Sequence, residues 1–321
     1  MKKFTGAVAA LLMLLCLSTQ AQAAEELVPG GQLIGLELES GYVCIAAFDE
    51  DLGAAPKAAG LQSGDRITAI DGKKVESAKD ISDALNRANG NVTLTAERDG
   101  SSFSVVLTPQ ITSDGPRLGL YLKQGTTGVG TVTYFDPDDG SFAALGHGVN
   151  DKNGQLIPMR SGKVYDVSVV TVRKGKAGQP GQLMSSLQGG ALLGALSKNT
   201  PYGVFGTLNG FNKSATIPVA DPKEVKTGDA IIRSTVSGNL TREYKVEIVK
   251  IYGASKNTGR NMLIKITDPA LLEATGGIVQ GMSGSPIIQD GKLVGAVTHV
   301  LVNDPTTGYG IFIENMLDAA A

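Results

Sequence analysis

Glycine divides this chain into many short apolar segments, and this spacing limits the fold more than any other feature. The 321 residues include 42 glycines and no tryptophan. Apolar runs of strand length, such as residues 164–172 and 293–302, lie between glycine-rich turns, and helical patterns are scarce in the second half of the chain. The pattern predicts a mainly β protein built as a barrel or sandwich rather than from alternating strands and helices.

The N-terminus has the pattern of a secretory signal peptide. Lys2 and Lys3 precede an apolar run over residues 7–17, and small residues follow at 21–24. We expect residues 1–23 to be a signal peptide that is removed after export. If the segment is retained instead, it provides the chain's only contact with the membrane. Either way, the remainder of the chain would act outside the cytoplasmic membrane.

The charge pattern excludes nucleic acid as a partner. The formal net charge is −2, and the basic residues form no stripe or cluster. The two histidines, His147 and His299, lie far apart in the sequence, and Cys44 is the only cysteine beyond the apolar N-terminal run. No glycine-rich phosphate loop precedes a helix. We therefore expect neither a metal site nor a cofactor.

Residues 27–110 are predicted to form a separate α+β domain. Strand-like segments at 34–38 and 92–97 flank a helical stretch over 77–89. Between them, residues 59–67 read Ala-Gly-Leu-Gln-Ser-Gly-Asp-Arg-Ile, a helix turn followed by a glycine turn and a strand. This arrangement resembles a PDZ domain.

The resemblance implies that this domain binds a peptide ligand. PDZ domains capture an extended peptide by β-augmentation along a glycine-containing loop and its adjoining strand. A turn without a ligand is the alternative interpretation of the matching segment. A polar joint over residues 111–117 then separates this domain from a second one, expected at 118–318. The residues of the expected peptide-binding loop are Gly30, Gly31, Gln32, Leu33, Ile34 and Gly35.

Residues 281–286, Gly-Met-Ser-Gly-Ser-Pro, are the most informative segment for chemistry. The glycines around Ser283 let the backbone approach a substrate carbonyl closely. The N–H groups of Gly281 and Ser283 are candidates for an oxyanion hole, and the motif looks like that of chymotrypsin-like proteases. A tight turn before the next strand is the alternative.

A nucleophilic serine needs a base, and His147 is the preferred candidate. It is flanked by glycines at the end of an apolar strand, which is a poor setting for a packed core histidine. His299 lies inside an apolar strand, where it packs in the core or lines a specificity pocket. The base in turn needs an acceptor, for which both Asp151 and Asp268 are candidates. Sequence chemistry alone does not choose between these two aspartates.

The second domain closely resembles the stage IV sporulation protein B family of serine peptidases. The resemblance implies a trypsin-like double β-barrel, with His147, Asp268 and Ser283 as catalytic residues. The matching segments are Phe-Ala-Ala-Leu-Gly-His-Gly-Val at 142–149, Ile-Thr-Asp-Pro-Ala-Leu-Leu at 266–272, Thr-Gly-Gly-Ile-Val-Gln-Gly-Met-Ser-Gly-Ser-Pro-Ile at 275–287 and Val-Thr-His-Val-Leu-Val-Asn-Asp-Pro-Thr at 297–306.

The family resemblance also implies a role in endospore formation. Such enzymes are secreted into the space between the forespore and mother-cell membranes. There they cleave themselves and a regulator of a membrane-embedded protease, so that a sigma-factor precursor is processed. Two alternatives remain: a quality-control protease of the cell surface, whose usual domain order differs, and a non-catalytic binding protein that retains the fold.

Overall fold

The structure is a computed structural model, and it describes residues 26–151, 154–186, 190–209, 215–253 and 259–321. The expected signal peptide at residues 1–23 lies outside these ranges. In the part of the chain that is described, no helix is long and apolar enough to cross a membrane.

The C-terminal part forms a closed β-barrel. Its strands alternate between buried and exposed residues, as in β18, where positions 244, 246 and 248 are buried and their neighbours are exposed. Ile232, Ile264 and Val297 are fully buried in the same core. The strands follow the ring order β17 (Gly228–Thr235), β18 (Thr241–Ile251), β19 (Met262–Ile266), β22 (Asp304–Phe312), β21 (Lys292–Leu301) and β20 (Pro286–Gln289).

Another closed ring of strands precedes this barrel in the sequence. It is called the first barrel below, and the C-terminal barrel is called the second barrel. Each neighbouring pair is antiparallel, and the pairing of β9 with β2 closes the ring. This arrangement confirms the expected double β-barrel. The ring order is β2 (Leu33–Phe48), β9 (Leu120–Phe135), β10 (Ser141–Ala144), β15 (Gly203–Leu208), β14 (Leu192–Thr200) and β11 (Met159–Asp166).

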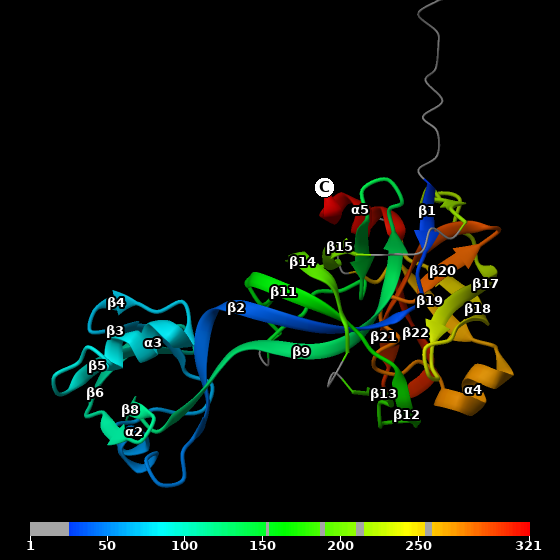
Figure 1. The fold of residues 1–321 in the computed structure, drawn as a ribbon. Coiled ribbons are helices and arrows are strands. Elements are labelled where there is room, and N and C mark those ends of the chain that lie inside the picture. The colour runs from blue at the N-terminus through cyan, green and yellow to red at the C-terminus, as the bar shows by residue number, and fades with distance from the viewer. Residues whose placement is uncertain (1–25, 152–153, 187–189, 210–214, 254–258) are drawn as a thin grey trace, which may run out of the picture.

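Strands β2 and β9 leave this first barrel together and enter a smaller lobe, seen at the left of Figure 1. The lobe has its own apolar core, which includes Ile67, Ile81 and Leu94. Ser77 caps α3 in a capping box with Asp80, as helix-start chemistry predicts. Its elements are α2 (Ala54–Ala58), β3 (Arg66–Ile70), β4 (Lys73–Lys74), α3 (Ala78–Leu85), β5 (Val92–Arg98), β6 (Ser101–Leu107), β7 (Gln110–Thr112) and β8 (Gly115–Arg117).

The expected domain boundaries, 27–110 and 118–318, need correction. Residues 34–39 of β2 pair with both β9 and β11 and belong to the first barrel, whereas Leu118, Leu120 and Leu122 pack into the core of the smaller lobe. The lobe therefore occupies about residues 40–124 and is inserted between the first two strands of a barrel. No flexible linker marks this boundary in the sequence, because each of the two long strands serves both domains.

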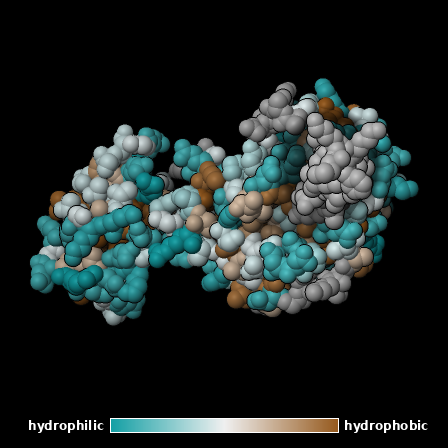
Figure 2. Space-filling view, turned by 90° about the horizontal axis from the view of Figure 1, so that it is seen from above, coloured by the Kyte–Doolittle hydropathy of each residue, from teal (hydrophilic) through white to brown (hydrophobic). Residues whose placement is uncertain are grey.

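The C-terminal helix packs where the two barrels meet. Tyr134 and Phe205 of the first barrel share a buried cluster with Ile311 of the second and with Ile313 and Met316 of the C-terminal helix. The visible face of the smaller lobe is mostly hydrophilic in Figure 2. The elements outside the two rings and the smaller lobe are β1 (Glu26–Pro29), β12 (Val169–Arg173), β13 (Gln182–Ser185), β16 (Ile217–Pro218), α4 (Pro269–Thr275) and α5 (Ile313–Ala320).

Candidate active site

Ser283 lies in a tight loop that leads into β20, at the junction of the two barrels. Gly281 and Gly284, on either side, have φ angles of +102° and +96°, which non-glycine residues rarely adopt. A Cβ on Gly284 would lie 2.0 Å from the carbonyl oxygen of Thr131, so only glycine permits this contact. Gly284 is therefore required by the packing of the loop on the first barrel, and Gly281 by its backbone conformation.

Strand β9 holds the serine loop in place. The Thr131 N–H donates to the carbonyl of Ser283 at 2.9 Å, and the Thr131 hydroxyl donates to that of Gly281 at 2.7 Å. The Thr133 hydroxyl donates to the carbonyl of Gly284 at 2.8 Å. Both hydroxyls are buried, so the loop is fixed by bonds that water does not replace.

His147 follows β10 in a turn that is sharply bent. Leu145 and Gly146 have φ angles of +73° and +68°, and this left-handed pair redirects the chain toward the second barrel. The Nδ1 atom of His147 lies 2.9 Å from the carbonyl oxygen of Gly148. A carbonyl oxygen only accepts hydrogen bonds, so Nδ1 carries the proton and Nε2 of the neutral ring has the free lone pair.

Ser283, His147 and His299 meet at this junction. The hydroxyl of Ser283 donates to the carbonyl of Thr298 at 2.7 Å, directly before His299. The rings of His147 and His299 have their centroids 5.1 Å apart. A Cβ on Gly284 would also lie 2.5 Å from the backbone nitrogen of Leu145, which shows how closely the two loops approach.

The expected oxyanion-hole residues keep free donors. Neither the Gly281 N–H nor the Ser283 N–H donates to an acceptor among the described residues, whereas the Met282 N–H between them bonds to Val279. Two unpaired N–H groups beside a serine hydroxyl are the arrangement that an oxyanion hole requires.

Burial lowers the pKa of His147 below its usual value, and the Gly148 carbonyl offsets this effect only partly. Partial burial and the nearby His147 and Arg260 lower the pKa of His299 to about 4. Since the residue is exposed overall, water screens part of the effect at His299. Both rings are therefore neutral near pH 7, and His147 is ready to accept a proton.

The structure does not bring Asp268 to His147, contrary to expectation. One oxygen of the Asp268 carboxylate accepts from the N–H groups of Ala270 and Leu271, and the other accepts from the backbone N–H of Lys245. Asp268 is thus the N-cap of α4. Among the described residues, no carboxylate contributes to the pKa of His147. The alternative candidate, Asp151, lies in a turn where its carboxylate accepts from the N–H of Gln155.

The expected peptide-binding loop at residues 30–35 also needs correction. The N–H groups of Gly30 and Gly31 donate to the carbonyls of Thr133 and Val132 within the barrel. Ile34 and Gly35 pair with β9 on one side and with β11 on the other. Both edges of this strand are occupied, so a peptide has no place to pair.

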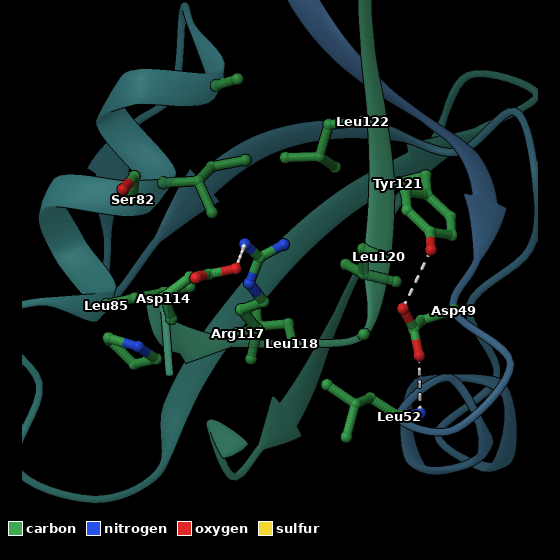
Figure 3. Close-up of a pocket in the computed structure, with 14 residues that line it drawn as sticks. Asp49, Leu52, Ser82, Leu85, Asp114, Arg117, Leu118, Leu120, Tyr121 and Leu122 are labelled. Atoms are coloured by element: carbon green, nitrogen blue, oxygen red, sulfur yellow. Dashed lines mark hydrogen bonds and ion pairs between the residues drawn. The ribbon is translucent and has the colours of Figure 1, made fainter. Parts of the chain in front are cut away.

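The smaller lobe instead contains a groove of about 290 Å³ between α3 and the start of β9 (Figure 3). Residues 120–123 of β9 pair with β2 alone in the described chain, so their other edge beside α3 carries no strand. At one end Arg117 is paired with Asp114, and at the other the Tyr121 hydroxyl donates to Asp49. The apolar wall residues include Leu52, Ile81, Leu85, Leu118, Leu120 and Leu122.

The sequence contained a signal for this groove. Residues 117–120 read Arg-Leu-Gly-Leu, and Gly119 has a φ angle of +68° in the turn that leads into β9. A Cβ there would lie 2.4 Å from the carbonyl oxygen of Leu52, so glycine is required. The expected boundary at residue 118 assigned this segment to the peptidase domain, so its glycine turn before a strand was not considered as part of a peptide-binding groove.

The fold and the serine loop define a trypsin-like double β-barrel with a PDZ-like lobe inserted into its first barrel. The sequence profile of the SpoIVB peptidase S55 family matches residues 114–317, and that of the PDZ domain matches residues 54–98. The chain belongs to the SpoIVB peptidase S55 family.

Curated relatives are similar over a short region only. The Bartonella henselae protein BH06270, whose name describes it as a candidate zinc metalloprotease, is 35% identical over 82 residues, which cover 25% of this chain and 22% of that protein. The similarly named mll0638 of Mesorhizobium japonicum is 36% identical over 90 residues, covering 27% and 24%. The alignment thus spans about a quarter of the length of these relatives.

Solved structures show a loose likeness. The active form of the Rv3671c protease from M. tuberculosis has a TM-score of 0.37 at 16% identity, covering 60% of this chain and 72% of that chain. The HtrA-type protease AlgW, with a tripeptide, has a TM-score of 0.36 at 12% identity, covering 60% and 54%. A PDZ domain from Listeria monocytogenes has a TM-score of 0.23 at 23% identity, covering 26% and 87%. The fold assignment rests on the strand pairing described above.

Proposed function

We propose that this protein is a serine endopeptidase in which Ser283 is the nucleophile and His147 the base. The observation that carries the proposal is the convergence at one junction of a serine hydroxyl, a half-buried neutral imidazole and two unpaired N–H groups. Membership of the SpoIVB peptidase S55 family supports the same chemistry.

The reaction would be acyl transfer. The Ser283 hydroxyl rotates from the carbonyl of Thr298 toward His147, which takes its proton as the oxygen attacks the peptide carbonyl. The N–H groups of Gly281 and Ser283 stabilise the resulting oxyanion. His147 then passes its proton to the leaving amine, and water hydrolyses the acyl-enzyme by the same steps.

We expect His299 to take part in substrate selection. This exposed residue has its ring beside that of His147, and it follows Thr298, whose carbonyl accepts the hydrogen bond from the Ser283 hydroxyl. We expect a His299→Ala variant to change the preference among peptide substrates of different sequence. A uniform loss of activity on every peptide would contradict this role and indicate a structural one.

The groove between α3 and β9 is the proposed docking site for a peptide ligand. An extended peptide would pair with the free edge of residues 120–123 and place apolar side chains against the groove wall. A Leu120→Lys substitution should abolish the binding of labelled peptides while the barrels stay folded. Unchanged binding would place the docking site elsewhere.

The biological role is proposed from family membership. We propose that the enzyme acts outside the cytoplasmic membrane, between the forespore and mother-cell membranes. Its substrates would be itself and a regulator of a membrane-embedded protease that processes a sigma factor. General quality control at the cell surface is the alternative role.

Labelling with a fluorophosphonate and mass spectrometry of self-cleavage test the activity together. The wild type should label and yield fragments over time, while Ser283→Ala should do neither. Labelling or fragments in the alanine variant would exclude Ser283 as nucleophile. A wild type that is folded but gives neither signal would favour a non-catalytic binding protein.

A further inference from the structure

One peptide group connects His147 to an asparagine on a neighbouring strand. The carbonyl of Gly148 accepts from Nδ1 of His147 at 2.9 Å. The N–H of Val149, which belongs to the same planar peptide group, donates to Oδ1 of Asn199 at 2.9 Å. Because the group is rigid, the bond at its N–H fixes the direction in which its carbonyl points.

Asn199 is itself held firmly. It lies near the end of β14, paired with Val204 of β15. Its Nδ2 donates to the carbonyls of Val149 and Ile157, each at 2.9 Å. With the acceptor bond to Val149, both donors and the oxygen of the amide are used, and its orientation follows from this pattern.

Glycine at position 148 makes this approach possible. A Cβ on Gly148 would lie 2.6 Å from the carbonyl oxygen of Thr200, the residue after Asn199. Any larger residue would push the end of β14 away from the histidine loop. The glycine after His147 therefore has a packing role that accounts for its place in the segment around the histidine.

We propose that Asn199 is a positioning residue for His147, doing through the Gly148–Val149 peptide what a carboxylate does directly in a catalytic triad. It holds the Gly148 carbonyl against Nδ1–H, so that Nε2 keeps its lone pair for Ser283. This inference rests on the proposed peptidase function. It also explains how the site is organised while Asp268 caps α4.

The electrostatics agree with this arrangement. A hydrogen bond to the peptide N–H polarises the group and strengthens its carbonyl as an acceptor. A neutral carbonyl nevertheless stabilises an imidazolium less than a carboxylate does. Burial accordingly outweighs the Gly148 carbonyl, and the pKa of His147 stays below its usual value.

Nitrogen NMR of the full chain labelled with ¹⁵N-histidine tests the proposal directly. The sequence has two histidines, so a His299→Asn variant identifies the signals of His147. At neutral pH the wild type should show His147 as the Nδ1–H tautomer. Asn199→Ala should shift His147 toward the Nε2–H tautomer that free histidine favours in water. An unchanged tautomer in a folded Asn199→Ala protein overturns the proposal.

The rate of fluorophosphonate labelling provides the functional readout. We expect Asn199→Ala to slow labelling by about ten- to a hundredfold, because loss of orientation at a reacting group has costs of this size. The matched control is Ser197→Ala on the same strand, which removes a side-chain bond to the Phe205 carbonyl and should label at the wild-type rate. Equal rates for the two variants would contradict the role of Asn199.

A second variant covers the case in which Asn199→Ala does not fold. Asn199→Asp keeps an acceptor for the Val149 N–H, while it replaces the donor group that faces the carbonyls of Val149 and Ile157 by a charged carboxylate oxygen. It should retain the Nδ1–H tautomer, and an Nε2–H tautomer would overturn the proposal. The tautomer is measured without any reaction, so a wild type that fails to label would refute the proposed function and leave the role of Asn199 to be decided by NMR.

Discussion

At the residue scale, the half-buried His147 should determine the pH dependence of the reaction. Its pKa is lowered by burial, so the folded protein keeps the ring neutral at pH values where an ordinary histidine is half protonated. The labelling rate should therefore fall only below about pH 6.5, the usual histidine pKa. A profile of labelling rate from pH 4 to 8 checks this. A midpoint at or above the usual histidine value would show that a carboxylate acts on the ring.

Asp268 offers the sharpest test between a capping role and a catalytic one. Asparagine caps helices about as well as aspartate, and the exchange loses only the long bond of 3.3 Å from the backbone N–H of Lys245. Asp268→Asn should therefore have nearly the stability and the labelling rate of the wild type. In a trypsin-like triad the same exchange costs about 10⁴ in kcat. Asp268→Ala, which removes the cap, should lower the free energy of unfolding by about 1 kcal/mol. A collapse of labelling in a stable Asp268→Asn protein would restore the triad.

Residue chemistry in the sequence pointed to His147 and Ser283 and could not identify the partner of His147. A histidine between glycines and a serine between glycines are local patterns, and the structure places them at one junction. Asn199 acts through backbone groups and lies in a different strand, so no local pattern marks it. Asp268 precedes a proline at a helix start, where capping and catalysis leave the same sequence signal.

At the element scale, strand β9 joins the peptide groove to the nucleophile loop, and its threonines can be tested. Thr131→Val keeps the shape and leaves the buried Gly281 carbonyl without its hydroxyl donor. We expect the free energy of unfolding to fall by about 1–3 kcal/mol and labelling to slow, because Gly281 carries one of the two proposed oxyanion N–H groups. Urea unfolding and the labelling rate measure the two effects.

Thr133→Val is the matched control for this prediction. It removes an equivalent buried bond to the Gly284 carbonyl, on the other side of Ser283 in the sequence from Gly281 and its proposed oxyanion N–H. The two variants should lose similar stability, with the slower labelling confined mainly to Thr131→Val. If both label at the wild-type rate, the loop keeps its geometry without these hydroxyls.

The sequence pattern predicted many of the strands, because a strand that is buried on one face has alternating apolar residues whichever strands it pairs with. Helix α3 was expected from its apolar spacing and begins at the Ser77 cap. The assignment of strands to domains was not predictable in the same way. The apolar pattern of residues 33–48 gives no sign that its first half pairs with β11 and its second half with β3.

At the scale of the whole molecule, the insertion of the smaller lobe predicts that the double barrel folds without it. Glu39 and Gly125 are directly paired across β2 and β9, and the lobe beyond them has a separate core. Replacing residues 40–124 by Asn-Gly should join these strands in a two-residue hairpin, whose type I′ turn this dipeptide favours. The register of the first barrel would be kept.

The excised protein should show a cooperative thermal transition at the temperature at which the barrels unfold in the full chain, and it should still label with fluorophosphonate. The full chain should show an additional transition, which is abolished by a core substitution confined to the lobe, such as Leu94→Ala. Loss of all cooperative unfolding on excision would mean that the lobe completes the barrel rather than interrupting it. In that case β2 and β9 would depend on both cores at once, and the groove and the nucleophile loop would form one cooperative unit.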